Sequence, residues 1–412
     1  MKLMNGKLYW PTTLPNPPRY PALDTDMACD VVIVGGGIAG ALCAYYLMKH
    51  DVKIALLEKR QIGGGSSMAN IGLLQFASDK SLTSCIHSFG EVKGTRFYQL
   101  CKQAIDQLEA ISHEVQPFPD FQRKDSLYYA SSPEDLDALR TEYALLKQHG
   151  FPVSFWERAD IERHCAFSKP GAIYAGGDAQ INPYRLTASI IAAVAARGMN
   201  VFEKTEFVHV KADACDMLVY TEKGHRIRCK KIVFATGYEA QAMKRNRNTK
   251  LSSTSAIVTA QVPALHRWPN TCLIWETARP YVYIRSTRDG RIIAGGMDEP
   301  VTDPQKREAT LFGKRDKLLA RVAELFPHIP LTAEFFWSAA FASTHDGLPL
   351  IGAQQDEPDC LFVLGYGGNG TVYSTIGGQI IADLIVKGKH PDAELFSLER
   401  TRFPSAAARP RL

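Results

Sequence analysis

The segment from Asp30 to Glu58, DVVIVGGGIAGALCAYYLMKHDVKIALLE, contains the residues whose types and spacing most clearly indicate chemistry. It holds a G-x-G-x-x-G pattern (Gly35, Gly37 and Gly40) directly after an apolar β-branched run. Gly35 permits a sharp turn, Gly37 lets a pyrophosphate approach the backbone, and Gly40 lets the following helix pack closely on its strand. The pattern predicts a dinucleotide site, and the alternative is a glycine-rich turn that binds nothing.

The residues that flank this turn suit the same ligand. A helix that begins at Ile38 and Ala39 presents free N–H groups, and the positive end of its dipole, to phosphates. Glu58 follows the second apolar run, where its carboxylate can accept hydrogen bonds from ribose hydroxyls. We expect Lys59, the next residue, to contact the nucleotide as well.

Two later apolar runs also end in glycine-containing loops. Residues 231–234 lead into Ala235-Thr236-Gly237, and residues 360–364 lead into GYGGNG, Gly365 to Gly370. In a doubly wound sheet, ligands bind beyond the carboxyl ends of the strands. We therefore expect a single nucleotide-binding fold assembled from segments that are far apart in the sequence.

Composition bounds the class of protein. A chain of 412 residues exceeds what one hydrophobic core usually supports, so two domains are expected. The net charge of +5 does not indicate nucleic-acid binding, and no apolar run is long enough for a membrane span. The nine cysteines are scattered without a C-x-x-C pair, which argues against disulfides and zinc and favours a cytoplasmic location.

The spacing of apolar residues predicts how the chain is organised. Helices are expected over 97–111, 132–149, 183–197 and 372–386, and an antiparallel meander over 200–229. Residues 1–28 are proline-rich and are expected to form an extended surface arm. The expected architecture is α/β: a discontinuous Rossmann-like domain (29–88, 171–250 and 341–402) and a second α+β domain with an antiparallel sheet (89–170 and 251–340).

Four motifs together resemble the D-amino-acid-oxidase-type FAD-dependent oxidoreductases, which include glycine oxidase, sarcosine oxidase and D-amino-acid dehydrogenase. They are VVIVGGGIAG with Glu58, GGGSSMANIGLL at 63–74, IVFATG at 232–237, and THDGLPLIG at 344–352 followed by LGYGGNGTVYS. The resemblance extends from Tyr9 to about Arg402. The proline-rich arm resembles the γ-glutamylputrescine-oxidase-like branch of this family.

The resemblance implies FAD, and the number of loops supports FAD over NAD. An NAD enzyme needs the first motif and the sheet, whereas the isoalloxazine of FAD must be held on several sides. The residues expected to hold FAD are Gly35, Gly37, Ile38, Ala39, Gly40, Glu58, Lys59, Ser66, Ser67, Asn70, Gly72, Leu73, Phe207, Thr236, Gly237, Gly367, Gly368, Asn369, Gly370 and Thr371.

This chain departs from its relatives where they bind a substrate carboxylate. The arginine of glycine oxidase falls at Phe341, and a basic residue of sarcosine oxidase falls at Val372. The flavin-linking cysteine of sarcosine oxidase falls near Ala339, so non-covalent FAD is expected. Arg279 is a candidate replacement clamp through two parallel hydrogen bonds, with a structural salt bridge as the alternative. Arg279, Tyr281 and Phe341 are the expected substrate contacts.

The resemblance implies oxidation of the C–N bond of an amine or amino acid, by hydride transfer to flavin N5 and hydrolysis of the imine. The cofactor carries the difficult step, so no catalytic residue is predicted. His87, His345 and Asp346 are possible polar groups at the site, with a structural role as the alternative. Electrons then pass to O2 or, in a dehydrogenase, to a quinone or carrier protein; a non-catalytic flavin-binding subunit is the third possibility.

Overall fold

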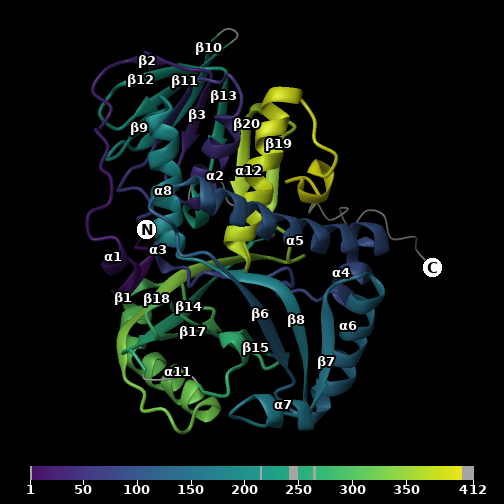
Figure 1. The fold of residues 1–412 in the computed structure, drawn as a ribbon. Coiled ribbons are helices and arrows are strands. Elements are labelled where there is room, and N and C mark those ends of the chain that lie inside the picture. The colour runs from purple at the N-terminus through teal and green to yellow at the C-terminus, as the bar shows by residue number, and fades with distance from the viewer. Residues whose placement is uncertain (1, 214–215, 241–248, 263–265, 401–412) are drawn as a thin grey trace, which may run out of the picture.

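The computed structural model describes residues 2–213, 216–240, 249–262 and 266–400 (Figure 1). Two large sheets organise the molecule, one in the upper half of Figure 1 and one in the lower half. Helices lie against both sheets, so the mixed α/β class expected from the sequence is confirmed.

The upper, six-stranded sheet is built from distant segments. Its order is β19 (Leu350–Gln354), β20 (Glu357–Leu364), β13 (Lys231–Phe234), β3 (Val31–Val34), β4 (Ile54–Leu57) and β9 (Asn200–Phe202). Only the edge strand β19 runs antiparallel to its neighbour. Strands β3 and β4 are buried along their whole length, which explains why they are continuous apolar runs.

The two faces of this sheet are covered differently. One face packs against helices α2 (Ile38–Leu47), α5 (Glu91–Glu114), α8 (Pro183–Ala196) and α12 (Gly370–Lys387). The other face packs against a four-stranded sheet of β10 (Phe207–Asp213), β11 (Asp216–Thr221), β12 (Arg226–Cys229) and β2 (Met27–Ala28). The helices predicted near 97–111, 183–197 and 372–386 are thereby confirmed.

The predicted antiparallel meander is confirmed from Phe207 onward. The prediction placed its start, at Asn200, too early. Residues Asn200–Phe202 form β9 and pair in parallel with β4 instead. The chain turns at Lys204, whose φ is +48°, and Thr205 donates a hydrogen bond to the carbonyl of Glu58 at 3.0 Å. This turn separates two strands that the sequence pattern had joined.

The lower sheet has ten strands and is mainly antiparallel. Its order is β1 (Met4–Lys7), β18 (Ala333–Thr344), β14 (Thr249–Thr259), β17 (Ile292–Glu299), β16 (Val282–Ser286), β15 (Leu273–Glu276), β6 (Gln122–Tyr129), β8 (Gly171–Gln180) and β5 (Leu73–Leu74), with β7 (Val153–Glu157) on β8. Helix α11 (Leu311–Leu325) packs on one face of it through Leu318, Val322 and Leu325 (Figure 1).

Short helices complete the chain. They are α1 (Trp10–Thr13), α3 (Ser66–Ala69), α4 (Leu82–Phe89), α6 (Leu136–Gln148), α7 (Arg158–His164) and α10 (Pro304–Ala309), with 3-10 turns at Pro133–Asp135, Gly237–Glu239, Pro269–Thr271 and Ala393–Phe396. Helix α6 and the turn before it account for the helix predicted over 132–149. No helix in the described ranges is both long enough and apolar enough to cross a membrane.

The N-terminal arm is more than a surface segment. Residues Met4–Lys7 form an edge strand on β18, and Trp10 is buried with its Nε1 donating to the carbonyl of Asn70 at 2.7 Å. Burial of a large aromatic ring that also satisfies its N–H group anchors the arm. Its first part is therefore integral to the lower sheet, unlike the surface arm expected from the prolines.

The predicted domain boundaries stay a prediction. Strand β8, which the sequence places in the nucleotide-binding domain, pairs in the lower sheet, and helix α5, which it places in the second domain, packs on α12. The predicted end at residue 402 lies outside the described residues.

Close packing of α12 on α2 gives a stability prediction. A Cβ at Gly378 would lie 2.9 Å from the carbonyl carbon of Leu42, whereas a Cβ at Gly313, on the exposed face of α11, would meet nothing within 4 Å. We expect Gly378→Ala to lower the free energy of unfolding by about 1–3 kcal/mol, because overpacked backbones must separate. The matched Gly313→Ala should leave it unchanged or raise it by up to about 1 kcal/mol. Chemical denaturation would measure both, and equal effects would contradict the packing argument.

Candidate functional site

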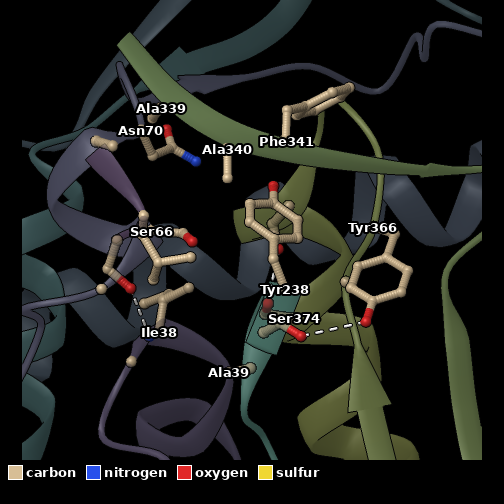
Figure 2. A pocket seen from close by; sticks show the side chains of 18 of the residues that line it. Ile38, Ala39, Ser66, Asn70, Tyr238, Ala339, Ala340, Phe341, Tyr366 and Ser374 are labelled. Carbon is tan, nitrogen blue, oxygen red and sulfur yellow. Dashed lines mark hydrogen bonds between the residues drawn. The ribbon is translucent and has the colours of Figure 1, made fainter. Parts of the chain in front are cut away.

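A cavity lies where the carboxyl ends of β3, β13 and β20 face the lower sheet (Figure 2). Figure 2 shows Ser66 and Asn70 on one side of it, and Tyr238, Tyr366 and Phe341 on the other. The upper sheet contributes mainly glycine loops, whereas the lower sheet contributes side chains from β14 to β18. The cavity thus joins the predicted cofactor loops to the predicted substrate domain.

The first glycine loop has the backbone form that the dinucleotide pattern requires. Gly35 has a φ of +116°, and a Cβ there would lie 2.4 Å from the carbonyl oxygen of Ala235. Gly37 is the N-cap of α2 and has no side chain to cover the helix end. The backbone N–H of Ile38 donates to Oγ of Ser67 at 2.8 Å, so the second loop is tied to the start of the helix. An uncovered helix N-terminus suits a pyrophosphate.

Glu58 is held at the end of β4 by backbone donors. Its carboxylate accepts hydrogen bonds from the N–H groups of Gly36 at 2.9 Å and Arg60 at 2.7 Å. Burial nevertheless raises the pKa of Glu58 above its ordinary value. Each carboxylate oxygen has a second lone pair, so Glu58 can also accept from a ribose hydroxyl.

Beyond Glu58 lies a cluster of paired charges. Lys59 Nζ lies 3.0 Å from Oε1 of Glu239, and Arg60 Nη2 lies 2.8 Å from the same oxygen. Lys59 is also 3.6 Å from Glu206. This end of the cavity, with Phe207 beside it, is polar and suits the adenosine half of FAD.

Several buried polar atoms of cavity-lining residues lack a hydrogen-bond partner among the described residues. They are Thr236 Oγ1, Gln75 Nε2, Trp275 Nε1 and Asp298 Oδ1. Buried polar groups are usually paired, so a concentration of unpaired ones around one cavity indicates a bound ligand. The positive-φ turn at Gly35, the uncovered helix end and Thr236 together fit FAD.

The structure brings most of the predicted cofactor residues together. All of them line the cavity except Gly40, Gly72 and Thr371, which lie behind its wall. Gly40 has a packing role, because a Cβ there would lie 1.9 Å from the carbonyl oxygen of Gly35. The carbonyl of Gly72 accepts from Arg285 at 2.8 Å, and Thr371 is buried at the start of α12. The contact of each residue with FAD stays a prediction.

The predicted substrate residues separate into two groups. Tyr281 and Phe341 line the cavity, but Arg279 does not. Nη1 of Arg279 donates to the carbonyls of Glu276, Thr277 and Ala278 at 2.9–3.3 Å. Its guanidinium lies 4.8 Å from the centre of the Tyr281 ring. The backbone around Arg279 therefore occupies one of its guanidinium nitrogens.

Sequence reasoning missed several residues at the inner end of the cavity. They are Gln75, Asp79, Tyr238, Thr254, Trp275, Tyr283, Asp298 and Tyr366. Tyr238 and Tyr366 each adjoin a motif glycine, which could have identified them. Asp79 and Asp298 carry no such signal, because only tertiary contacts bring them to the cavity: strand pairing for Asp298, and hydrogen bonds to Tyr281 and Gly368 for Asp79.

Two acidic residues belong to this inner end. Asp79 accepts hydrogen bonds from the hydroxyl of Tyr281 at 2.6 Å and from the N–H of Gly368 at 2.9 Å. Asp298 projects from β17, and burial raises its pKa to about 6. The expected polar groups His87, His345 and Asp346 do not line the cavity, and Asp346 instead pairs with Arg400 at 2.8 Å.

Residues 30–384 match the DAO family, described as FAD dependent oxidoreductase. The chain belongs to this family. It is 27% identical to glycine oxidase of Geobacillus kaustophilus over 387 residues, which cover 90% of this chain and 97% of that protein. It is 22% identical to gamma-glutamylputrescine oxidoreductase of Escherichia coli, over 92% of this chain and 87% of that protein.

The fold agrees with this assignment. The crystal structure of the Geobacillus glycine oxidase superposes with a TM-score of 0.76 at 24% identity, over 90% of this chain and 99% of that chain. The predicted resemblance, the flavoprotein class and FAD as cofactor are thus confirmed. The protein is an FAD-dependent oxidoreductase of the DAO family.

The phosphate position can be tested at Gly37. We expect Gly37→Val to abolish or strongly reduce FAD occupancy, because the side chain would cover the N-terminus of α2 where the pyrophosphate approaches. The ratio of flavin to protein absorbance in purified protein measures this. Gly313→Val, an identical substitution on exposed α11, is the control and should retain full occupancy. Full occupancy in both variants would place the phosphate elsewhere.

The adenosine end can be tested at Glu58. Glu58→Ala removes a charged hydrogen-bond acceptor, so FAD binding should weaken by about 1.5–3 kcal/mol while the protein stays folded. Titration of the apoprotein with FAD gives the affinity, and circular dichroism checks the fold. An unchanged affinity would show that Glu58 serves only the N–H groups of Gly36 and Arg60.

Proposed function

We propose that the protein oxidises the C–N bond of an amine or amino acid and releases an imine that water hydrolyses. FAD supplies the hydride acceptor, flavin N5, when it is bound. The observation that carries this proposal is the single cavity that runs from the dinucleotide loops to a pocket of aromatic and polar side chains. The names of the relatives, glycine oxidase and gamma-glutamylputrescine oxidoreductase, support the reaction class.

The residues of the pocket serve to bind and orient the substrate. Hydride transfer requires the reacting carbon at roughly 3–3.5 Å from its acceptor and a neutral amine. Tyr238 stands beside Phe341 and Tyr366, with ring centres 6.3 and 5.8 Å away, and this wall excludes water from one side. Tyr281 is fixed by its hydrogen bond to Asp79. Positioning of this kind needs no acid–base pair, because the cofactor carries the difficult step.

The lining favours an amine over a small amino acid. Phe341 lines the cavity and Val372 is fully buried, so neither position where relatives bind a carboxylate carries a charge. Arg279 as a clamp stays a prediction: it does not line the cavity, and its Nη1 is already bound to backbone carbonyls. An amine with an apolar or aromatic body therefore suits the pocket better than glycine.

How FAD is attached to the protein is also a proposal. We infer that FAD is held without a covalent link, because Ala339 lies where sarcosine oxidase has its cysteine. Acid precipitation should then leave the flavin in the supernatant. The cytoplasmic location and the electron acceptor, O2 or a carrier, stay predictions.

Anaerobic reduction of the flavin tests the reaction class. We expect primary and secondary amines with apolar or aromatic bodies to bleach the absorption band of oxidised flavin faster than glycine or sarcosine, because the pocket lacks the carboxylate-binding residues of relatives. Stopped-flow absorbance across a panel of amines and of D- and L-amino acids provides the rates. Faster bleaching by glycine would overturn the amine preference, and bleaching by no amine or amino acid would overturn the function.

Arg279→Ala tests the clamp. For any amino acid that the enzyme oxidises, KM should rise about tenfold or more. KM for amines without a carboxylate should change little, because only the amino acids lose a charge-assisted pair. Arg288→Ala is a control, because Arg288 is an exposed arginine that does not line this cavity. Equal effects of Arg279→Ala on both substrate types would assign Arg279 a structural role.

A further inference from the structure

The two ends of the cavity differ in whether their charges are paired. In the part of the chain that the structure describes, Lys59 and Arg60 are the basic residues that line the cavity, and both pair with Glu239 at the adenosine end. The inner end has two carboxylates, Asp79 and Asp298, and no basic residue among the described lining. A ligand that enters the inner end therefore meets negative charge.

Asp298 is a partly buried carboxylate that no cation contacts within the described residues, although Lys314 and Arg279 lie near enough to act on its charge. Its Oδ1 is inaccessible to solvent and has no hydrogen-bond partner within the described ranges, where it also forms no ion pair. The nearest lysine on α11, Lys314, instead pairs with Glu299 at 3.1 Å and donates to the carbonyl of Met297 at 3.0 Å. Buried charges are normally paired, so the position of Asp298 calls for a cation from outside the chain.

Asp79 adds a second carboxylate to the inner end of the cavity. The hydroxyl of Tyr281 and the N–H of Gly368 fix its carboxylate between the lower sheet and the last glycine loop. Both donors are neutral, so neither contact places a cation beside the Asp79 carboxylate. Its field also contributes to the raised pKa of Asp298.

The walls around the two carboxylates are aromatic. The rings that line this end are Tyr238, Trp275, Tyr281, Tyr283, Phe341 and Tyr366. Aromatic faces attract organic cations, especially where water is excluded. Gln75 Nε2 and Trp275 Nε1 are the unpaired donors here, and because they are neutral they do not offset the carboxylates.

We propose that the inner end of the cavity is a binding site for an organic ammonium ion, with Asp298 as its ion-pair partner. The substrate class is then an amine on an apolar or aromatic body that carries no carboxylate. It binds as its ammonium ion, which gives up one N–H proton, to the Asp298 carboxylate or to water, before the hydride leaves. That the bound amine is oxidised rests on the proposed function, whereas binding of the ammonium ion does not depend on it.

The first test uses the holoenzyme and two ligands of similar size. Phenyltrimethylammonium has no N–H group and no nitrogen lone pair, so it cannot form an imine and reports binding alone; benzoate is its anionic counterpart. We expect the ammonium ion to perturb the flavin absorption spectrum saturably, and benzoate to bind about tenfold more weakly or not at all. Equal or tighter binding of benzoate would overturn the proposal.

The second test assigns the site to Asp298. Asp298→Asn keeps the shape of the side chain and should weaken phenyltrimethylammonium binding about tenfold or more, since the attraction between opposite charges is lost. Benzyl alcohol, a neutral ligand, should bind both proteins alike. The control Asp316→Asn removes the same charge from an exposed position on α11 and should change nothing. Equal affinity of the wild type and Asp298→Asn for the ammonium ion would overturn the assignment.

Failure of this inference can be told apart from failure of the proposed function. If the ammonium ion binds through Asp298 but no amine bleaches the flavin, the site stands and the oxidation is wrong. If amino acids bleach the flavin and the ammonium ion does not bind, the oxidation stands and the site is wrong. Should Asp298→Asn lose its flavin, the comparison of the two ligands in the wild type still decides.

Discussion

The position of β13 between β3 and β20 is the constraint on which the rest of the site depends. Both pairings are parallel, so three strands from distant parts of the chain end at the same edge of one sheet. Each strand then enters a glycine-containing loop, and the loops approach so closely that a Cβ at Gly35 would meet the carbonyl of Ala235. The cofactor cradle is a direct consequence of this strand order.

The cavity is assembled from two kinds of surface. At the upper sheet, backbone groups and glycines form the wall, because a pyrophosphate and a flat ring system require close approach of the main chain. At the lower sheet, side chains on neighbouring strands form it, among them Thr254 on β14, Tyr283 on β16 and Asp298 on β17. The first wall suits a ligand shared by many enzymes, whereas the second can change with the substrate.

Two partly buried carboxylates of the cavity illustrate how surroundings set the role of a residue. Burial raises the pKa of both Glu58 and Asp298. Glu58 accepts two backbone hydrogen bonds, which hold its charge in place at the end of β4. Asp298 has one oxygen with no partner in the described structure, so its charge is available to a ligand. The same functional group thus orders a loop in one place and, in the proposed ammonium site, faces the ligand in the other.

The sequence by itself determined the cofactor half of this protein. The glycine spacing, the apolar runs before each loop and Glu58 are local patterns, and local backbone geometry is what glycine and short buried strands specify. They sufficed to predict FAD and most of the residues that line its end of the cavity. The tertiary structure decided the substrate half. Asp79 and Asp298 are more than two hundred residues apart, and only the pairing of β17 with β14 and β16, and the contact of Asp79 with Tyr281 and Gly368, bring them to one cavity. Long-range strand pairing leaves no periodic signal in a single sequence. The sequence therefore indicates Arg279 as a substrate contact but does not indicate Asp79 or Asp298.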